Sequence, residues 1–174
     1  GGGLGSDAFR RGMGGVGGVH LLTLARLGVG AFHIADFDHF DIANFNRQVG
    51  ATMSTLAQPK VEVLARMARD INPDIELSVY PQGVNGANLD AFFEGVDLYV
   101  DGLDFFAFQA RQSTFATCAR LGVPALPASP PGRGTSLRLF HPRTVGLTED
   151  CGWVELPSTA SPADFLSCPC TRCF

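Results

Sequence analysis

The sequence contains two positive side chains whose types and spacing suit the binding of a phosphorylated ligand. Arg47 and Lys60 lie thirteen residues apart, and Lys60 is the only lysine of a chain that has twelve arginines. Arginine binds phosphate oxygens with a planar fork of N–H groups, and lysine binds them with a compact point charge. The pair can therefore neutralise the β- and γ-phosphates of a triphosphate, whereas the alternative is a solvated pair on the surface.

An acidic residue follows the apolar segment 31–35. This residue, Asp36, comes nineteen residues after Gly17. In a doubly wound sheet, an acidic side chain at this place accepts hydrogen bonds from the ribose hydroxyls of a nucleotide. The alternative is an ordinary loop aspartate at the end of a strand, and Asp38 and Asp41 are open to the same two interpretations.

Two further carboxylates, Asp101 and Asp104, follow the apolar segment 98–100. Ligands of open α/β sheets bind at the carboxyl ends of the strands, so an acid here can hold a Mg²⁺ ion that bridges phosphate oxygens. An ordinary Asp-Gly turn at a strand end is the alternative.

Five of the seven residues from Gly12 to Gly18 are glycine. Such a run turns tightly and lets backbone N–H groups approach an anion, and a helix that starts behind it adds a positive dipole end. The glycines predicted to face phosphates are Gly12, Gly14, Gly15 and Gly17. We expect the helix to be buried through Val16, Val19, Leu22 and Leu27. A tight strand-to-helix turn without a ligand is the alternative.

The elements that must position these residues alternate between strand and helix. Apolar runs predict strands, and apolar residues at helical spacing predict helices, one of which starts at Pro59. The predicted elements after the first helix are strand 31–35, helix 59–71, strand 75–79, helix 88–94, strand 98–100, helix 107–121 and strand 123–126. This order predicts an α/β, Rossmann-like fold with a mostly parallel sheet and helices on both faces.

The two ends of the chain depart from this pattern. Residues 1–11 contain two arginines where an apolar central strand is expected, so the sequence predicts no recognisable first strand there. Eight of the eleven prolines lie between Pro124 and Pro169, and only 136–140 looks like a strand. We therefore expect a nucleotide-binding domain over 1–140, poorly matched over 1–11, and a loop-rich, truncated extension over 141–174.

Composition limits the classes of function. The net charge of −4 argues against nucleic-acid binding by bulk electrostatics, and no apolar run approaches the roughly 20 residues of a membrane span. Four of the five cysteines fall in the last 24 residues, whereas a disulfide scaffold would spread them more widely. These features favour a reduced, cytoplasmic setting.

Seven short motifs occur in one order at compatible spacings. They are Gly12-x-Gly14-Gly15-x-Gly17, Ala25-Arg26-Leu27-Gly28-Val29-Gly30, Asp36-Phe37-Asp38, Asn44-x-x-Arg47-Gln48, Pro59-Lys60-Val61-Glu62, Ile71-Asn72-Pro73 and Val100-Asp101-Gly102-Leu103-Asp104. Over about residues 12–126 the chain thereby resembles the ThiF/MoeB adenylyltransferases, which are relatives of the ubiquitin-activating enzymes. The resemblance implies an enzyme that adenylates the C-terminal carboxylate of a small ubiquitin-like or sulfur-carrier protein with ATP and releases pyrophosphate. Because relatives often act as dimers, it also implies a homodimer.

The resemblance also implies roles for single residues. The glycine run would cradle phosphates, Asp36 would hold the ribose, and Asp104 would bind Mg²⁺. The residues implied to contact the triphosphate are Asn44, Arg47, Gln48 and Lys60. Attack by a carboxylate on the α-phosphate accumulates negative charge, so cations and a metal matter more than a general base, which makes Arg47, Lys60 and Asp104 the catalytic candidates.

Cysteines near the end of the chain resemble part of a zinc site. Many relatives hold structural zinc with two Cys-x-x-Cys pairs, and Cys170 and Cys173 match the first pair. Cys151 and Cys168 can complete four thiolates, although their spacing is unusual for zinc. The alternative is a disordered tail with free thiols.

Two other functions fit parts of the same pattern. A nicotinamide-dependent oxidoreductase uses the same fold, but Arg47, Lys60 and Asp104 would then have no role. A non-catalytic pseudo-enzyme that binds a ubiquitin-like partner would account for the missing first strand.

Overall fold

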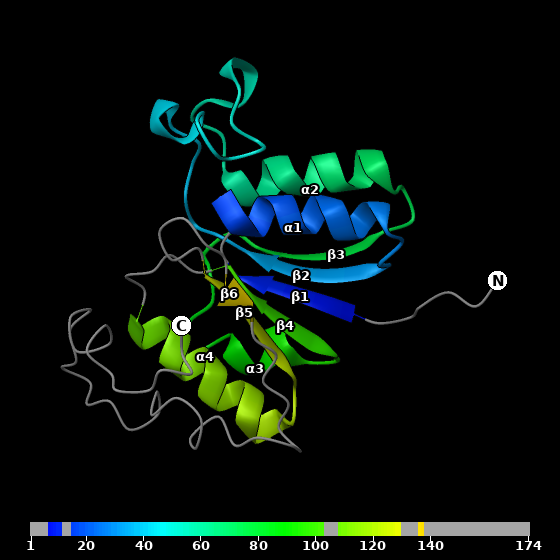
Figure 1. The fold of residues 1–174 in the computed structure, drawn as a ribbon, viewed down its shortest axis with the longest axis vertical. Helices are drawn as coiled ribbons and strands as arrows, with labels where there is room; N and C mark the ends of the chain where they lie inside the picture. Colours follow the sequence, from blue (N-terminus) through cyan, green and yellow to red (C-terminus); the bar gives the residue numbers. More distant parts are fainter. Residues whose placement is uncertain (1–6, 12–14, 103–107, 130–135, 138–174) are drawn as a thin grey trace. The chain divides into compact units, whose positions relative to one another are not determined.

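The computed structural model describes residues 7–11, 15–102, 108–129 and 136–137 (Figure 1). The chain divides between Leu103 and Asp104 into two compact units. The first unit contains every predicted nucleotide-binding residue except Asp104, which lies outside the described residues. The predicted domain boundary at 140/141 also lies outside them and stays a prediction.

The strands of the first unit form a parallel sheet in the order β3-β2-β1-β4. Their bounds are β1 Asp7–Arg11, β2 Ala31–Ala35, β3 Glu76–Tyr80 and β4 Leu98–Asp101. Helices α1 (Gly15–Arg26), α2 (Lys60–Ile71) and α3 (Leu89–Phe93) connect them. The predicted alternation of strand and helix, and the parallel sheet that follows from it, are confirmed.

Strand β1 corrects the expectation for the N-terminal segment. Residues 7–11 pair in register with β2 on one side, where Phe9 lies opposite His33, and with β4 on the other, where Phe9 lies opposite Tyr99. The prediction of no strand at 1–11 was therefore wrong. Strand preference depends on context, and pairing on both sides can override an unfavourable local sequence.

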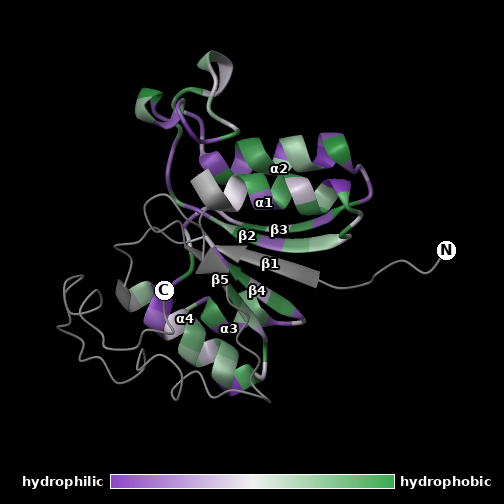
Figure 2. Ribbon diagram, viewed as in Figure 1, coloured by the Kyte–Doolittle hydropathy of each residue, from purple (hydrophilic) through white to green (hydrophobic). Residues whose placement is uncertain are grey.

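Helices cover both faces of this sheet (Figure 1). On one face, Phe32 and Ile34 of β2 are completely buried in a core that includes Leu21 of α1 and Leu64 of α2. Because side chains alternate along a strand, His33 between them points to the other face. There its Nδ1 atom lies 2.9 Å from the carbonyl oxygen of Phe92 in α3. Figure 2 shows hydrophobic and hydrophilic residues mixed along α1 and α2, as expected of helices with one buried side.

The buried side of α1 agrees with the predicted one at Leu22, which is 4% exposed, and differs from it at two other residues. Leu21, Leu22 and Ala25 are buried, whereas Val19 and Leu27 are 47% and 72% exposed. Gly18 lies on the buried side, where an added Cβ would come within 3.2 Å of Leu64 in α2. Helix α1 therefore packs through a small residue followed by larger ones at helical spacing, so the expected burial of Val19 and Leu27 was wrong.

The second unit contains one described helix and one strand pair. Helix α4 (Phe108–Leu121) confirms the helix predicted over 107–121, and it ends at Gly122, whose φ of 73° favours glycine. Strands β5 (Ala125–Ser129) and β6 (Ser136–Leu137) pair antiparallel. Residues 138–140 of the predicted last strand, and the extension 141–174, lie outside the described residues.

Among the described residues, no helix is both long enough and apolar enough to cross a membrane.

Candidate functional site

The carboxyl end of β2 and the start of α2 are joined by a short antiparallel contact. The backbone N–H of Phe40 donates to the carbonyl of Gln58, and that of Ala57 donates to the carbonyl of Phe40, both at 2.9 Å. Next to them, His39 and Pro59 form an isolated β-bridge, which is flanked by the bond from Phe40 to Gln58 and by a bond from the N–H of Lys60 to the carbonyl of Asp38. This contact places the N-terminus of α2 beside the edge of the sheet where parallel α/β proteins bind ligands.

An ion pair completes the junction. The Nζ atom of Lys60 donates to Oδ2 of Asp38 at 3.1 Å, and the backbone N–H of Lys60 donates to the carbonyl oxygen of Asp38 at 2.9 Å. The lysine side chain is only 7% exposed, whereas that of Asp38 is 53% exposed. The single ammonium group of a lysine side chain in this protein is thus held at the end of β2.

Asp36 lies two residues before Asp38 and is buried. Its Oδ1 atom accepts the backbone N–H of Asp38 at 2.8 Å, and its own N–H donates to the carbonyl of Tyr80 in the neighbouring strand at 3.3 Å. The carboxylate is therefore fixed in orientation. Its place at the carboxyl end of β2 agrees with the predicted ribose contact.

A short 3₁₀ helix, η1 (Ile42–Asn44), positions the next predicted residues. Asp41 caps it, because its Oδ1 accepts the N–H of Ala43 at 2.9 Å, while the N–H of Asp41 donates to Oδ1 of Asn44 at 3.0 Å. This bond fixes the orientation of the buried Asn44 amide. Its Nδ2 group has no acceptor among the described residues, so its two N–H donors are unused there.

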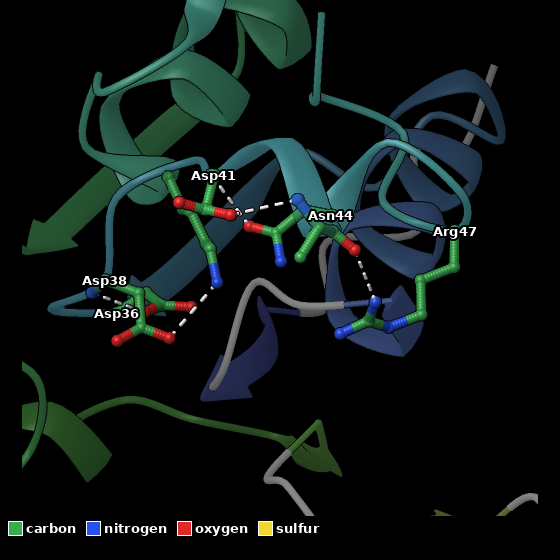
Figure 3. Close-up of polar contacts among 7 residues, drawn as sticks. Asp36, Asp38, Asp41, Asn44 and Arg47 are labelled. Atoms are coloured by element: carbon green, nitrogen blue, oxygen red, sulfur yellow. Dashed lines mark hydrogen bonds and ion pairs between the residues drawn. The ribbon is translucent and has the colours of Figure 1, made fainter.

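Arg47 follows on the same turn and is exposed. Its Nη1 atom donates to the carbonyl of Ala43 and to Oδ1 of Asn46, both at 3.0 Å. Within the described part of the chain, its Nη2 and Nε atoms have no acceptor. Figure 3 shows Arg47 apart from Asp36 and Asp38, with Asn44 drawn between them. In the described part of the chain, Arg47 bonds to Ala43 and Asn46 and the ammonium of Lys60 bonds to Asp38, so the two cations share no partner.

Gln48 carries a buried acceptor that the protein does not use. The residue is 7% exposed, and its Oε1 is the one buried side-chain N or O atom without a hydrogen-bond partner among the described residues. A buried polar atom left unpaired costs about 1–3 kcal/mol. Such an atom is expected where a ligand supplies the missing partner.

The glycine run is described only in part. Gly15 and Gly17 belong to the first turn of α1, which contains no acidic residue, while Gly12 and Gly14 lie outside the described residues. Figure 1 shows the N-termini of α1 and α2 at the same edge of the sheet as the carboxyl end of β2. Since Gly18 packs beside Val49 and Leu64, the first turn of α1 lies next to the segment that carries Arg47 and Gln48.

Asp38, for which the sequence predicts no contact with the lysine, bonds to two of the predicted site residues, Asp36 and Lys60. From the sequence, Asp38 is open to the same interpretations as Asp36, and its position 22 residues before Lys60 gives no signal of the ion pair. Asp101 is also buried, and its Oδ1 accepts a hydrogen bond from the hydroxyl of the buried Tyr99 at 3.2 Å. This bond lies in the interior of the first unit.

The predicted metal ligands are not placed by the structure. Asp104 and the four C-terminal cysteines lie outside the described residues. Within the part of the chain that is described, no three histidine, cysteine or acidic side chains converge to hold a metal ion. Cys118 lies on α4 and is buried, which agrees with a packing role.

A comparison with known protein families matches residues 6–173 to the ThiF family. The sulfur carrier protein ThiS adenylyltransferase of Escherichia coli is 33% identical over 152 residues, which is 87% of this chain and 60% of that protein. The tRNA threonylcarbamoyladenosine dehydratase of Bacillus subtilis is 34% identical over 116 residues, which is 66% of this chain and 45% of that protein.

A solved structure gives the same result. The E. coli tRNA N6-threonylcarbamoyladenosine dehydratase, TcdA, in complex with ATP, superposes with a TM-score of 0.66 at 29% identity, over 70% of this chain and half of that one. The chain thus spans about half the length of these relatives. The structural similarity supports the Rossmann-like fold class. Because the family match covers nearly the whole sequence, this chain belongs to the ThiF family.

Proposed function

We propose that this chain binds ATP and transfers its adenylyl group to the C-terminal carboxylate of a small ubiquitin-like or sulfur-carrier protein. The observation that carries the proposal is the junction at the end of β2, where Asp38 links the ammonium of Lys60 to the buried carboxylate of Asp36. One group suits a phosphate and the other suits a ribose. Relatives in the same family include a ThiS adenylyltransferase and an enzyme crystallised with ATP.

The donor groups fit a triphosphate nucleotide. Asn44 and Arg47 present N–H groups that no described residue accepts, and α1 begins without an acidic residue in its first turn. The unpaired Oε1 atom of Gln48 accepts hydrogen bonds, so it suits a donor on the ligand or on a bound water. The segment 41–48 therefore contributes both hydrogen-bond donors and an acceptor, in addition to the ammonium of Lys60.

The charge balance supports a further cation. Segment 36–48 carries three carboxylates, from Asp36, Asp38 and Asp41, against the positive charges of Arg47 in the same segment and of Lys60, which is paired with Asp38. A bound triphosphate would add several negative charges. A divalent ion neutralises such charge in ATP-using sites, and we retain Asp104 as the residue that would hold Mg²⁺.

The proposed reaction joins the carboxylate oxygen of the partner to the α-phosphorus of ATP and breaks the bond from that phosphorus to the bridging oxygen of pyrophosphate. No proton is transferred, because the attacking carboxylate is already ionised at neutral pH. Lys60 and Arg47 stabilise the negative charge on the phosphates, and Asp36 fixes the ribose. The products are an acyl adenylate and pyrophosphate.

Exchange of labelled pyrophosphate into ATP tests this proposal. With Mg²⁺ and a candidate carrier protein, we expect exchange that depends on the carrier, and Lys60→Ala should reduce it at least tenfold. The matched control is Arg66→Ala, which removes an exposed cation of α2. Absence of exchange with every carrier and with tRNA would contradict adenylation, and intact carrier binding without ATP binding would select the pseudo-enzyme.

The nicotinamide-dependent alternative makes a different prediction for the same protein. Tighter binding of NAD than of ATP would favour it. We propose ATP because both cations of the edge then have a phosphate partner.

Three parts of the proposal concern features that the structure does not describe. A zinc ion on Cys170 and Cys173 is tested by metal analysis of the purified protein, with Cys170→Ser as the comparison. A homodimer is tested by the molar mass in solution. A cytoplasmic location stays a prediction from the distribution of the cysteines.

A further inference from the structure

Asp38 is bonded to Lys60 in two ways, although 22 residues separate them in the chain. Its carbonyl oxygen accepts the backbone N–H of Lys60 at 2.9 Å, and its carboxylate accepts the side-chain Nζ at 3.1 Å. Among the described residues, the carboxylate is the only acceptor of that ammonium group. Both ends of a long, flexible side chain are thus tied to one residue.

Backbone hydrogen bonds, rather than this ion pair, join the two segments. The carboxylate of Asp38 is 53% exposed, so solvent weakens the attraction, although the side chain of Lys60 is 7% exposed. The bridge between His39 and Pro59 and its flanking backbone bonds already hold the two segments together. The side chain of Asp38 is therefore not needed to join β2 to α2, and its effect falls on the position of the ammonium group.

We propose that Asp38 is a positioning residue that holds Lys60 ready for the phosphates of the nucleotide. This inference rests on the proposed function, because it names ATP as the ligand. An ammonium group has three N–H donors, and Asp38 uses one of them. The other two have no acceptor in the described part of the chain, so they are available for phosphate oxygens without a change of the lysine side chain.

The same residue connects the ribose position with the phosphate position. Asp36 Oδ1 accepts the backbone N–H of Asp38, and Asp38 in turn holds Lys60. The three residues form one chain of hydrogen bonds from a buried carboxylate to the ammonium. Preorganisation of this kind lowers the ordering cost of binding, since the rotamer freedom of a lysine is lost before the ligand arrives.

The single lysine allows a test without any ligand. In protein labelled with ¹⁵N and ¹³C in lysine only, one set of side-chain signals reports on Lys60. We expect an ordered side chain in the parent, increased mobility of the Cε–Nζ group in Asp38→Ala, and recovery of order in Asp38→Asn, which keeps an oxygen acceptor. The control Asp74→Ala removes an exposed carboxylate that precedes β3 and should leave the signals unchanged.

Calorimetric titration with ATP and with AMP tests the role in binding. We expect Asp38→Ala to raise the Kd for ATP about five- to tenfold and to change the Kd for AMP less than twofold, because AMP lacks the outer phosphates. Asp38→Asn should restore most of the ATP affinity. Equal losses for ATP and AMP, tighter ATP binding by Asp38→Ala, or lysine signals that are mobile in the parent would each overturn the inference.

The two tests separate the inference from the proposed function. If the parent binds neither nucleotide, the proposed function and the ligand of this inference both fail, whatever the lysine signals show. If the parent binds ATP and Asp38→Ala binds both nucleotides as the parent does, only the role of Asp38 is contradicted.

Discussion

Lys60 Nζ lies 3.1 Å from Oδ2 of Asp38, across 22 residues of intervening chain. One partner follows β2, and the other is the first residue of α2. Their contact is a consequence of the antiparallel segments around His39 and Pro59 rather than of sequence proximity. This relationship gives the predicted phosphate-binding lysine a fixed place next to the predicted ribose-binding aspartate.

Gly50 is packed so tightly that there is almost no room for a Cβ atom at this position. A Cβ atom there would lie 2.6 Å from Cζ of Phe40, whose ring is 2% exposed, and 3.2 Å from Leu64. We expect Gly50→Ala to lower the free energy of unfolding by about 1–3 kcal/mol, because a buried ring cannot move away freely. Urea denaturation of Gly50→Ala beside Gly30→Ala, where nothing lies within 4 Å of the added Cβ, measures the effect. Equal stability of the two variants would contradict the packing described here.

Gln48 should show opposite effects on stability and on binding. Replacement by methionine, which has a similar shape, removes a buried acceptor that has no partner in the described part of the chain. We expect Gln48→Met to unfold at the same urea concentration as the parent or a higher one, because the desolvation cost disappears. ATP should bind about tenfold more weakly, since the ligand loses a partner. A clear loss of stability with unchanged ATP binding would show that Gln48 has a structural role instead.

The pKa of Tyr80 is raised, first by burial of the hydroxyl and then by the nearby charge of Glu94. The unfolded chain therefore releases this proton at a lower pH than the folded protein, whose neutral tyrosine also donates to the carbonyl of Ala91 at 3.3 Å. The contribution to stability is complete below the ordinary tyrosine pKa of about 10 and is lost as the pH rises through the raised value. Thermal unfolding between pH 8 and pH 11 should show a smaller alkaline decrease in Tm for Tyr80→Phe than for the parent. Identical pH profiles would contradict this assignment.

The core between α1, α2 and the sheet depends on Leu64, which is completely buried. Truncation leaves a cavity beside Gly18, so we expect Leu64→Ala to lower the free energy of unfolding by about 2–5 kcal/mol. Met53→Ala shortens a side chain that is 73% exposed, and this variant should change the free energy of unfolding by less than about 0.5 kcal/mol. Chemical denaturation compares the two, and a small effect at Leu64 would place the core elsewhere.

The periodic parts of the fold were predictable from the sequence. Helix α2 has an apolar residue at each helical spacing and a proline before it, and the structure confirms it from Lys60 to Ile71. Strand 31–35 was also predicted, and β2 has the same bounds. In both segments the local pattern and the tertiary environment agree, which is the condition under which periodicity is informative.

Two other parts were not predictable because tertiary packing decides them. Strand β1 contains Arg10 and Arg11, and its identity depends on pairing with strands that lie more than twenty residues further along the chain. The buried side of α1 starts with Gly18, which has no side chain to mark it as apolar. A pattern based on large residues therefore selected Val19 and Leu27, which are exposed.

The residues of the candidate site were proposed one by one from the sequence, but their arrangement was not. Asp36, Asn44, Gln48 and Lys60 were identified from their types and from the resemblance to a family. The bond from Asp38 to Lys60 and the unpaired acceptor of Gln48 are three-dimensional facts that follow from the path of the chain between β2 and α2. No spacing rule in one sequence specifies either of them.

The most direct measurement of the central claim is calorimetric titration of ATP, with Mg²⁺ present, into the parent, Lys60→Ala and Arg66→Ala. All three proteins should fold, because the stem of Lys60 can be shortened without removing the backbone bonds of the junction. We expect one ATP site in the parent, at least tenfold weaker binding by Lys60→Ala, and binding by Arg66→Ala within twofold of the parent. Equal ATP affinity of the parent and a folded Lys60→Ala would contradict it.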